Sequence, residues 1–447
     1  MTRLRNISGV IAFLFCCTSL AAHAKPVTFS TNDYVAALKK VTDVMVNDVT
    51  SPVAASRYYA YINVASEEMI ALQKGNKALS FEGKLNGFQG VKTTNKILPE
   101  NFSFSIILTV FRMGQRLLPS GYLLKQQADS FLLLAQKRGL KKEQIQQVDN
   151  IVSELVKQIF SYSKKDGFFK LNNLPRYTPT NGDAWWQPTP PTFISPVEPY
   201  WNTLRTFLLD SAQQYKPAAP ALYDTSRTSS FYSQLKEVYD IGKKHDPKQA
   251  ATAMFWDCNP FAVQQIGHVE FGLKKISPAG HWIGITGIAC RKEKYGLEKT
   301  VLIHALVSIG LADAIIACWD EKYRSNRVRP ETVINRIIDP HWRPLLQTPP
   351  FPEYVSGHSV TSTAAAVILT KIFSDNFSYS DDTEVEFGLP IRKFHSFFSA
   401  SQEAAISRMY GGIHYRDAID NGISQGRKVG EFVNQKLSSY FELLKNK

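Results

Sequence analysis

The sequence predicts an all-α fold, a large helical protein made of two packed helix bundles. Apolar residues recur at three- and four-residue spacing through most of the 447 positions, as one buried helix face requires. No stretch alternates apolar and polar residues convincingly, and loops rich in Gly, Asn and Pro separate the periodic segments. The hydrophobic fraction of 44% is ordinary for a globular protein, and the length allows one large core or two.

The first 24 residues are predicted to be a secretory signal peptide and not part of the fold. Arg3 and Arg5 precede an apolar run over residues 7–20, and the Ala-His-Ala sequence at 22–24 offers a cleavage site. The run is short for a membrane anchor. Cleavage would remove two basic residues, so the formal charge would change from +13 to +13 − 2 = +11. We therefore expect an exported protein, either periplasmic or secreted.

Residues 25–184 are expected to form an N-terminal helical region, and residues 185–447 a helical domain that holds the functional site. The loop predicted at 164–199 contains Trp185, Trp186 and seven prolines, and so many aromatic side chains favour an ordered loop. The main helices are predicted at 33–47, 55–73, 105–118, 123–138, 142–163, 200–210, 229–245, 297–322, 359–374, 391–409 and 415–444, with shorter ones at 247–257 and 263–273.

The longest apolar stretch of the mature chain, residues 301–319, is nearly long enough to span a bilayer. It contains His304 and Asp313 and has charged residues just outside, which favours a buried core helix. We therefore expect no integral membrane segment after signal cleavage.

The basic residues are scattered, and the sequence contains no nucleic-acid-binding motif, so the positive charge favours a small anionic substrate. Cys258, Cys290 and Cys318 remain after cleavage. They allow either one disulfide and a free thiol or three buried thiols, and their spacing fits no zinc site.

Two segments of the C-terminal half place cations and hydrogen-bond donors near each other. Lys322 and Arg329 are seven residues apart, so they can share one helical face, which Pro330 ends. Further on, three prolines precede Ser356-Gly357-His358, after which a Ser-, Thr- and Ala-rich helix is predicted to begin. Helix N-termini have free N–H groups and favour anions. Each pattern alone has a commoner structural explanation, a solvated basic face or a turn before a core helix.

A third segment adds one more cation and a second imidazole. Arg408 lies on a predicted helix that Gly411 and Gly412 interrupt, and His414 follows. A lone histidine is more often a core residue. The three segments together nevertheless offer three cations, two hydrogen-bond donors and two histidines, which a tetrahedral or trigonal-bipyramidal oxyanion needs.

These segments resemble the signature shared by type-2 phosphatidic acid phosphatases, bacterial acid phosphatases and vanadium-dependent haloperoxidases. The signature is Lys-x6-Arg-Pro, then Pro-Ser-Gly-His, then Ser-Arg-x5/6-His-x3-Asp, and its parts occur here in that order. The soluble bacterial haloperoxidases are the most similar branch, over about residues 185–435. That similarity includes Trp319, Phe351-Pro352, Phe255-Trp256-Asp257, Gly280-His281-Trp282 and residues 313–320.

The resemblance implies a haloperoxidase that uses bound vanadate, hydrogen peroxide and a halide. His414 would bond the vanadium axially, His358 would act as acid and base, and Lys322 would polarise the peroxide. The remaining roles it implies are oxyanion binding by Lys322, Arg329, Ser356, Gly357 and Arg408, and a halide pocket at Trp319 and Phe351.

Two alternatives remain open at this stage. The same pocket would serve an acid phosphatase without a cofactor, in which His414 forms a phosphohistidine and His358 protonates the leaving oxygen of a phosphomonoester. A non-enzymatic phosphate-binding or surface protein would need only the cations. The oligomeric state is not predicted.

The sequence departs from the shared signature at two positions. Val355 replaces the proline before Ser356, and position 418, where the signature has an aspartate, is alanine. Asp417 is the candidate to orient His414 by a hydrogen bond to its far nitrogen, although a carboxylate elsewhere would serve as well.

Overall fold

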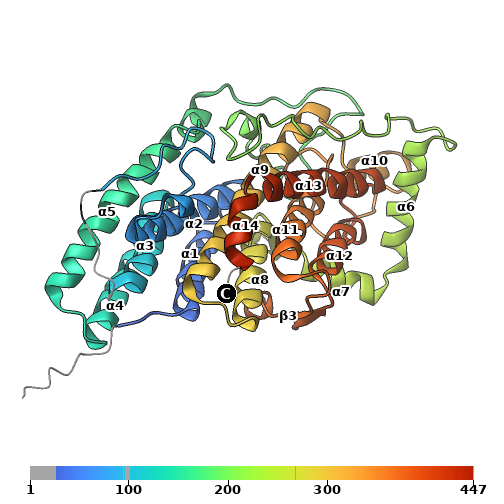
Figure 1. Cartoon of the computed structure of the whole chain (residues 1–447). Coiled ribbons are helices and arrows are strands. Elements are labelled where there is room, and N and C mark those ends of the chain that lie inside the picture. Colours follow the sequence, from blue (N-terminus) through green and yellow to red (C-terminus); the bar gives the residue numbers. More distant parts are fainter. Residues whose placement is uncertain (1–26, 94, 96–100, 267, 446–447) are drawn as a thin grey trace, which may run out of the picture.

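The computed structural model describes residues 27–93, 95, 101–266 and 268–445, so the predicted signal peptide lies outside the described residues. The chain is mostly helical, which confirms the all-α prediction (Figure 1). The N-terminal helices lie close to their predicted bounds. They are α1 (Thr31–Asn47), α2 (Pro52–Lys74), α3 (Phe102–Leu117), α4 (Leu124–Lys137) and α5 (Lys142–Lys164).

The C-terminal half contributes nine further α-helices among the described residues. They are α6 (Ser230–Lys244), α7 (Pro247–Phe255), α8 (Pro278–Lys292), α9 (Leu297–Ser325), α10 (Pro330–Ile337), α11 (Gly357–Phe373), α12 (Phe397–Tyr410), α13 (Arg416–Lys436) and α14 (Ser438–Lys445). The sequence pattern does not predict α8 or α10. Helix α8 is buried on most sides and has no polar stripe, and α10 spans only eight residues.

Helix α9 passes through the middle of the molecule and packs against α2 and α11. Its side chains from Thr300 to Lys322 are all buried. Within the described part of the chain it is the one helix long and apolar enough to cross a membrane, and its most apolar window is completely buried inside the protein. This burial is the environment predicted for a core helix.

One continuous cluster of buried hydrophobic side chains extends from α1 to α14, so the N-terminal helices share a core with the C-terminal ones. A second, smaller cluster joins α6, α10, α12 and α13. The predicted boundary at residues 184 and 185 falls in a long irregular stretch, in which Trp186 is completely buried and Trp185 is 40% exposed. The three cysteines in the described part of the chain, Cys258, Cys290 and Cys318, are free thiols, and all are buried.

Two predicted helices are wrong. Residues 200–210 form only a 3-10 turn at Trp201–Thr203, because the buried carboxylate of Asp313 takes the backbone N–H groups of residues 207, 208 and 209 at 2.6, 2.7 and 3.0 Å. Residues 263–273 form the antiparallel strands β1 (Val263–Ile266) and β2 (Val269–Gly272). Two other short strands, β3 (Tyr379–Asp381) and β4 (Arg392–Phe394), pair before α12, so the helix predicted from 391 begins later.

Candidate oxyanion site

Four helix ends meet at one small cavity in the C-terminal half. Lys322 lies in the last turn of α9, Arg329 precedes the first residue of α10, Ser356 caps α11, and Arg408 lies in the last turn of α12. Each of these side chains, and that of His414, is at most 3% exposed. The structure therefore brings the predicted cations, the helix start and the histidine into one buried region.

Backbone carbonyl groups of the proline-rich loop hold the Lys322 ammonium group. Its Nζ donates to the carbonyl oxygens of Val355 at 2.6 Å and of Pro352 and Glu353 at 3.1 Å each. Burial lowers the pKa of Lys322 to about 7, and the charge of Arg329 contributes. A small change in the charge nearby would therefore shift the protonation of Lys322.

Arg329 lies directly beside His414. Its Nε donates to the Phe351 carbonyl at 3.0 Å, and its Nη1 donates to the Ile413 carbonyl at 2.8 Å. The same Nη1 lies 3.2 Å from Nε2 of His414, while Nη2 is buried without a hydrogen-bond partner among the described residues. Burial lowers the pKa of Arg329 to about 10. An unpartnered buried guanidinium nitrogen is costly, which indicates a place for an acceptor.

Arg408 lies on the side of His358. Its Nη1 donates to the Trp256 carbonyl and is 3.4 Å from Nε2 of His358, while its Nε is buried without a partner in the described residues. Asp257 lies 3.8 Å from Nη2. Within the described residues no other acidic side chain forms an ion pair with Lys322, Arg329 or Arg408, so the cavity carries an excess of positive charge.

Glu353, not Asp417, holds the far nitrogen of His414, and the Asp417 prediction is wrong in this respect. Oε1 of Glu353 is 2.8 Å from Nδ1 of His414 and accepts the Tyr415 N–H at 3.0 Å. Asp417, in the first turn of α13, instead pairs with Arg327 at 2.6 and 2.8 Å and accepts the Ala221 N–H at 2.9 Å. Arg327 also contacts the second oxygen of Glu353 at 2.6 Å.

This arrangement fixes which nitrogen of His414 faces the cavity. Glu353 accepts the Nδ1 proton, which leaves the lone pair of Nε2 toward Arg329 and the cavity. Burial, followed by the charges of Arg329 and Lys322, lowers the pKa of His414 well below its usual value. Burial and the charge of Arg408 do the same to His358. Both imidazoles are therefore neutral near pH 7 and can accept a bond or a proton.

The start of α11 supplies the remaining polar groups. Ser356 Oγ accepts the Ser359 N–H at 3.3 Å, and other first-turn N–H groups have no intrahelical partner. A Cβ added to Gly357 would lie 3.7 Å from the Trp319 ring and 4.0 Å from Cε of Lys322. These are ordinary van der Waals distances, so a methyl group at position 357 would not clash.

Aromatic and aliphatic side chains close the other sides of the cavity, which has a volume of about 40 Å³. The rings of Trp319 and Phe351 are 5.0 Å apart and lie within 5.8 Å of the Lys322 Nζ. The other lining residues are Pro52, Cys258, Asn259, Pro278, Ile315, Pro349, Gly357, His358, Thr361, Arg408, Ile413 and His414. Arg408 and His414 line the cavity, while Arg329 and Lys322 lie behind that lining, against His414 and against the Trp319 and Phe351 rings. This buried set of cations around a neutral imidazole suits a small tetrahedral oxyanion.

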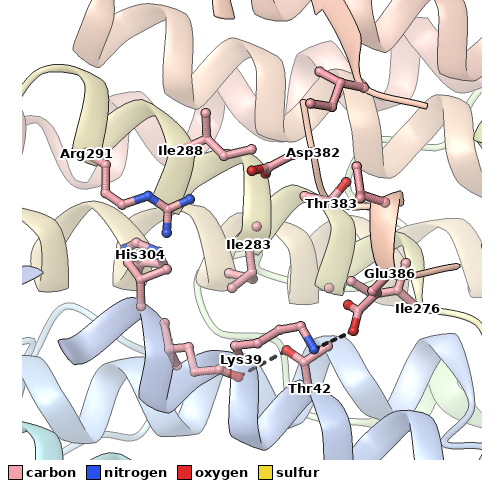
Figure 2. A pocket seen from close by; sticks show the side chains of 16 residues that line it. Lys39, Thr42, Ile276, Ile283, Ile288, Arg291, His304, Asp382, Thr383 and Glu386 are labelled. Carbon is pink, nitrogen blue, oxygen red and sulfur yellow. Dashed lines mark hydrogen bonds and ion pairs between the residues drawn. The ribbon is translucent and has the colours of Figure 1, made fainter. Parts of the chain in front are cut away.

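A larger cavity of about 540 Å³ lies elsewhere, between α1, α8 and residues 382–391 (Figure 2). Its walls are mainly aliphatic, and a Lys39–Glu386 ion pair of 2.9 Å lies at its edge. His304 and Arg291 also line it, but the two catalytic histidine candidates do not. His304 is a core residue, as predicted, with Nδ1 2.7 Å from the Thr300 carbonyl.

The chain is similar to several known proteins. Residues 302–443 match a family model described as the VCPO second helical-bundle domain. A solved bacterial vanadium-dependent iodoperoxidase is similar over 92% of this chain and 98% of its own, with 42% sequence identity and a TM-score of 0.86. Apo- and holo-type structures of a bacterial vanadium-dependent chloroperoxidase are 17% identical, with TM-scores of 0.66 and 0.63, and cover 88% and 87% of this chain and 95% and 93% of their own. No curated protein matches the chain.

Proposed function

The chain belongs to the vanadium-dependent haloperoxidases, a superfamily of enzymes, and from this premise we propose that it oxidises a halide with hydrogen peroxide at a bound vanadate. Iodide is the halide we propose first, because the similar solved protein at 42% identity is an iodoperoxidase. The predicted signal peptide supports action outside the cytoplasm, in the periplasm or after secretion.

The observation that carries this proposal is the neutral Nε2 of His414 beside three cations and two unpartnered guanidinium nitrogens. In the proposed complex His414 holds the vanadium, and the charge of the oxyanion is balanced by the side chains around it. We propose that the oxygens of the oxyanion are bound by Lys322, Arg329, Arg408, Ser356 and the N–H of Gly357.

Bound vanadate supplies a Lewis-acidic centre that makes peroxide electrophilic toward a halide. The protein residues bind, orient and transfer protons. Lys322 would act on the peroxide through its positive charge, because its three ammonium N–H groups already donate to three backbone carbonyls, which fix its Nζ in place. His358, whose pKa burial lowers well below its usual value, would accept a proton from the peroxide and return one to the oxygen that leaves. Trp319 and Phe351 exclude water from the place that the halide would take.

One observation also favours phosphate-ester hydrolysis as a second candidate. A histidine nucleophile needs its attacking nitrogen free and the other nitrogen held by a carboxylate, and the Glu353–His414 pair has this form. Phosphate and vanadate have similar shapes and charges, so the same cations would hold either one. The simple binding protein is set aside, because the chain belongs to a family of enzymes.

The deciding experiment compares both activities in one preparation. Purified mature protein is depleted of vanadium, orthovanadate is added back, and iodide oxidation by peroxide is measured. Hydrolysis of a chromogenic phosphate ester is measured without vanadate. We expect oxidation that depends on vanadate. Ester hydrolysis that vanadate inhibits, without any iodide or bromide oxidation, would overturn the haloperoxidase proposal in favour of the phosphatase.

The variant His414→Ala is expected to abolish vanadate-dependent oxidation, because it removes the one nitrogen positioned to hold vanadium. His395→Ala is the matched control, since His395 is exposed on the segment before α12. Full activity in the His414→Ala variant would contradict the site assignment.

A further inference from the structure

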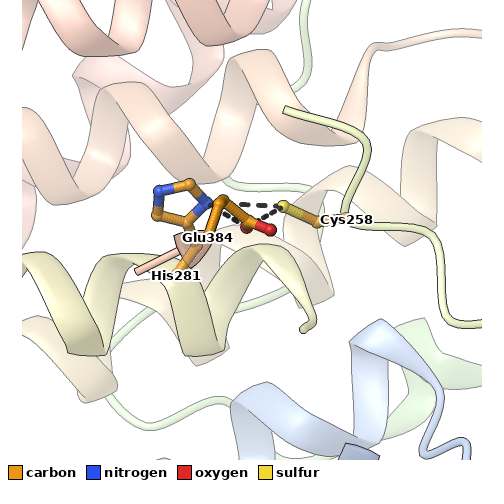
Figure 3. Close-up of side chains that lie close together, drawn as sticks. All are labelled: Cys258, His281 and Glu384. Carbon is orange, nitrogen blue, oxygen red and sulfur yellow. Dashed lines mark hydrogen bonds and ion pairs between the residues drawn. The ribbon is translucent and has the colours of Figure 1, made fainter. Parts of the chain in front are cut away.

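Three side chains of the types that bind metals lie close together although they come from separate parts of the chain (Figure 3). One of them, Cys258, also lines the oxyanion cavity. Cys258 follows α7, His281 lies in the first turn of α8, and Glu384 follows β3. They are 2%, 0% and 5% exposed, respectively. Their spacing in the sequence, 23 and 103 residues, resembles no zinc motif, so only the fold reveals the cluster.

The three donor atoms have the separations of one face of a metal tetrahedron. Nδ1 of His281 is 3.0 Å from Oε1 of Glu384 and 3.5 Å from Sγ of Cys258, and Sγ is 3.8 Å from Oε1. Around tetrahedral zinc, with Zn–S of about 2.3 Å and Zn–N and Zn–O of about 2.0–2.2 Å, such ligand atoms are about 3.4–3.6 Å apart. Shifts of a few tenths of an ångström would bring all three to one ion.

The surroundings hold the imidazole in the orientation that a metal ligand needs. Oδ2 of Asp381 lies 2.8 Å from Nε2 of His281, so Nδ1 is left to face the thiol and the carboxylate. Thr383 in turn fixes Asp381, with its N–H at 3.0 Å and its hydroxyl at 2.7 Å from Oδ1. The Trp256 ring stacks on the imidazole at 4.6 Å.

We propose that Cys258, His281 and Glu384 bind a divalent transition-metal ion, zinc by preference, at a site distinct from the vanadate site. A thiolate, an imidazole and a carboxylate form a mixed S, N and O ligand set that suits zinc. The thiolate and the carboxylate together balance the two positive charges of the ion. Cys258 also lines the oxyanion cavity, so a water molecule from that side completes the tetrahedron.

The proposed ion has a positioning role. It would link the irregular segment after α7 to α8 and to the segment after β3. The segment after α7 also contacts Arg408, through the Trp256 carbonyl and through the Asp257 carboxylate. A bound metal would therefore keep Arg408 in place for the oxyanion, without touching the oxyanion itself.

The test measures the metal directly, in the full-length mature protein. Elemental analysis after purification from zinc-containing medium is expected to find one zinc ion per chain. After removal by a chelator, cobalt(II) is titrated in and the near-ultraviolet thiolate-to-cobalt charge-transfer band is recorded. Cys258→Ala is expected to lose both the zinc and the band. Cys290→Ala, which removes an equally buried free thiol from α8, is expected to keep both.

Two further variants keep the test decisive if Cys258→Ala does not fold. Asp381→Asn retains all three ligands and is expected to bind zinc about 10–100-fold more weakly, because it loses the carboxylate behind the imidazole. His414→Ala is expected to retain zinc, since it alters only the oxyanion site. A folded wild-type protein that takes up neither zinc nor cobalt, or loss of zinc from His414→Ala, would overturn the proposal.

Discussion

Two buried histidines are held by carboxylates in the same way, but the charges around them are opposite. Glu353 lies 2.8 Å from Nδ1 of His414, and Asp381 lies 2.8 Å from Nε2 of His281. The other close charges are cationic at His414 and anionic at His281. Burial and the cations lower the pKa of His414 well below its usual value. Burial also acts to lower the pKa of His281, but Asp381 and the hydrogen bonds of Cys258 and Glu384 raise this pKa well above its usual value.

The difference teaches that a carboxylate behind an imidazole does not by itself select a ligand. The carboxylate sets the orientation of the ring and its tautomer, and the remaining neighbours set the charge of what can bind at the other nitrogen. At His414 those neighbours are three cations, which favour an oxyanion. At His281 they are a thiol and a second carboxylate, which favour a cation.

The largest effect is expected from breaking the unit at His414 with Glu353→Gln. Glu353 is completely buried and contacts both His414 and Arg327, so its loss leaves buried charge uncompensated. We expect the free energy of unfolding, measured by urea denaturation, to fall by about 3–5 kcal/mol.

The control for this variant is Asp417→Asn. Asp417 is partly exposed and pairs with the same Arg327, but it does not contact His414. We expect it to lose about 1 kcal/mol and to retain oxidation activity. Equal losses in the two variants would show that Glu353 has no special role.

The next effect concerns the cations alone. Arg408→Ala should weaken oxyanion binding by about 1.5–3 kcal/mol, a factor of roughly 10–150, because one charged hydrogen bond is lost. Equilibrium dialysis of vanadate measures this change. Arg427→Ala, at an exposed position on α13, is the matched control and should leave the affinity unchanged. An affinity for vanadate within twofold of wild type in Arg408→Ala would place the anion elsewhere.

The smallest effect is a proton linkage at Lys322. Its pKa is about 7 in the folded protein and 10.5 when unperturbed, so without an anion it loses its charge as the pH rises above about 7. An anion restores the charge, and binding should therefore take up protons above pH 7. Sulfate is the probe, because its charge is constant in this range. Its affinity should fall by at most about tenfold per pH unit.

Calorimetry of sulfate binding in buffers of different ionisation enthalpy measures the uptake, and Lys322→Met should abolish it. The unfolded chain binds more protons at Lys322 between about pH 7 and 10.5, so the anion-free protein should become more stable across this window, by at most about 1.4 kcal/mol per unit. Proton uptake that persists in Lys322→Met would assign the linkage to another group.

Much of the fold and site could be predicted from the sequence because the relevant signals are local. The period of the apolar residues located α1 to α5 and α9, and the three motif segments contained the cations and both histidines that the structure brings together. Prediction was weakest where long-range contacts decide the structure. Residues 200–210 have a helical apolar pattern, yet Asp313 captures their backbone N–H groups.

The partner of His414 was missed for a related reason. The spacing of the shared signature leads to Asp417, which lies on a regular helix. Glu353 instead lies in an irregular loop 61 residues earlier. The one sequence signal for it was an acidic residue among prolines and aromatic residues, three positions before Ser356. A charge in such surroundings needs a partner, which is reason to search for one.

The hydrogen bonds that the N–H groups of residues 207–209 donate to Asp313 also bear on the order of folding. These contacts join positions 104 to 106 residues apart, so the earlier segment cannot settle until α9 has been synthesised and has found its place. Before α9 is made, the carbonyl groups of residues 207 and 209 can already accept hydrogen bonds from Asn86, but the N–H groups of residues 207–209 lack their acceptor. The segment around residues 207–209 is therefore expected to reach its final conformation only after α9 has taken its place in the core.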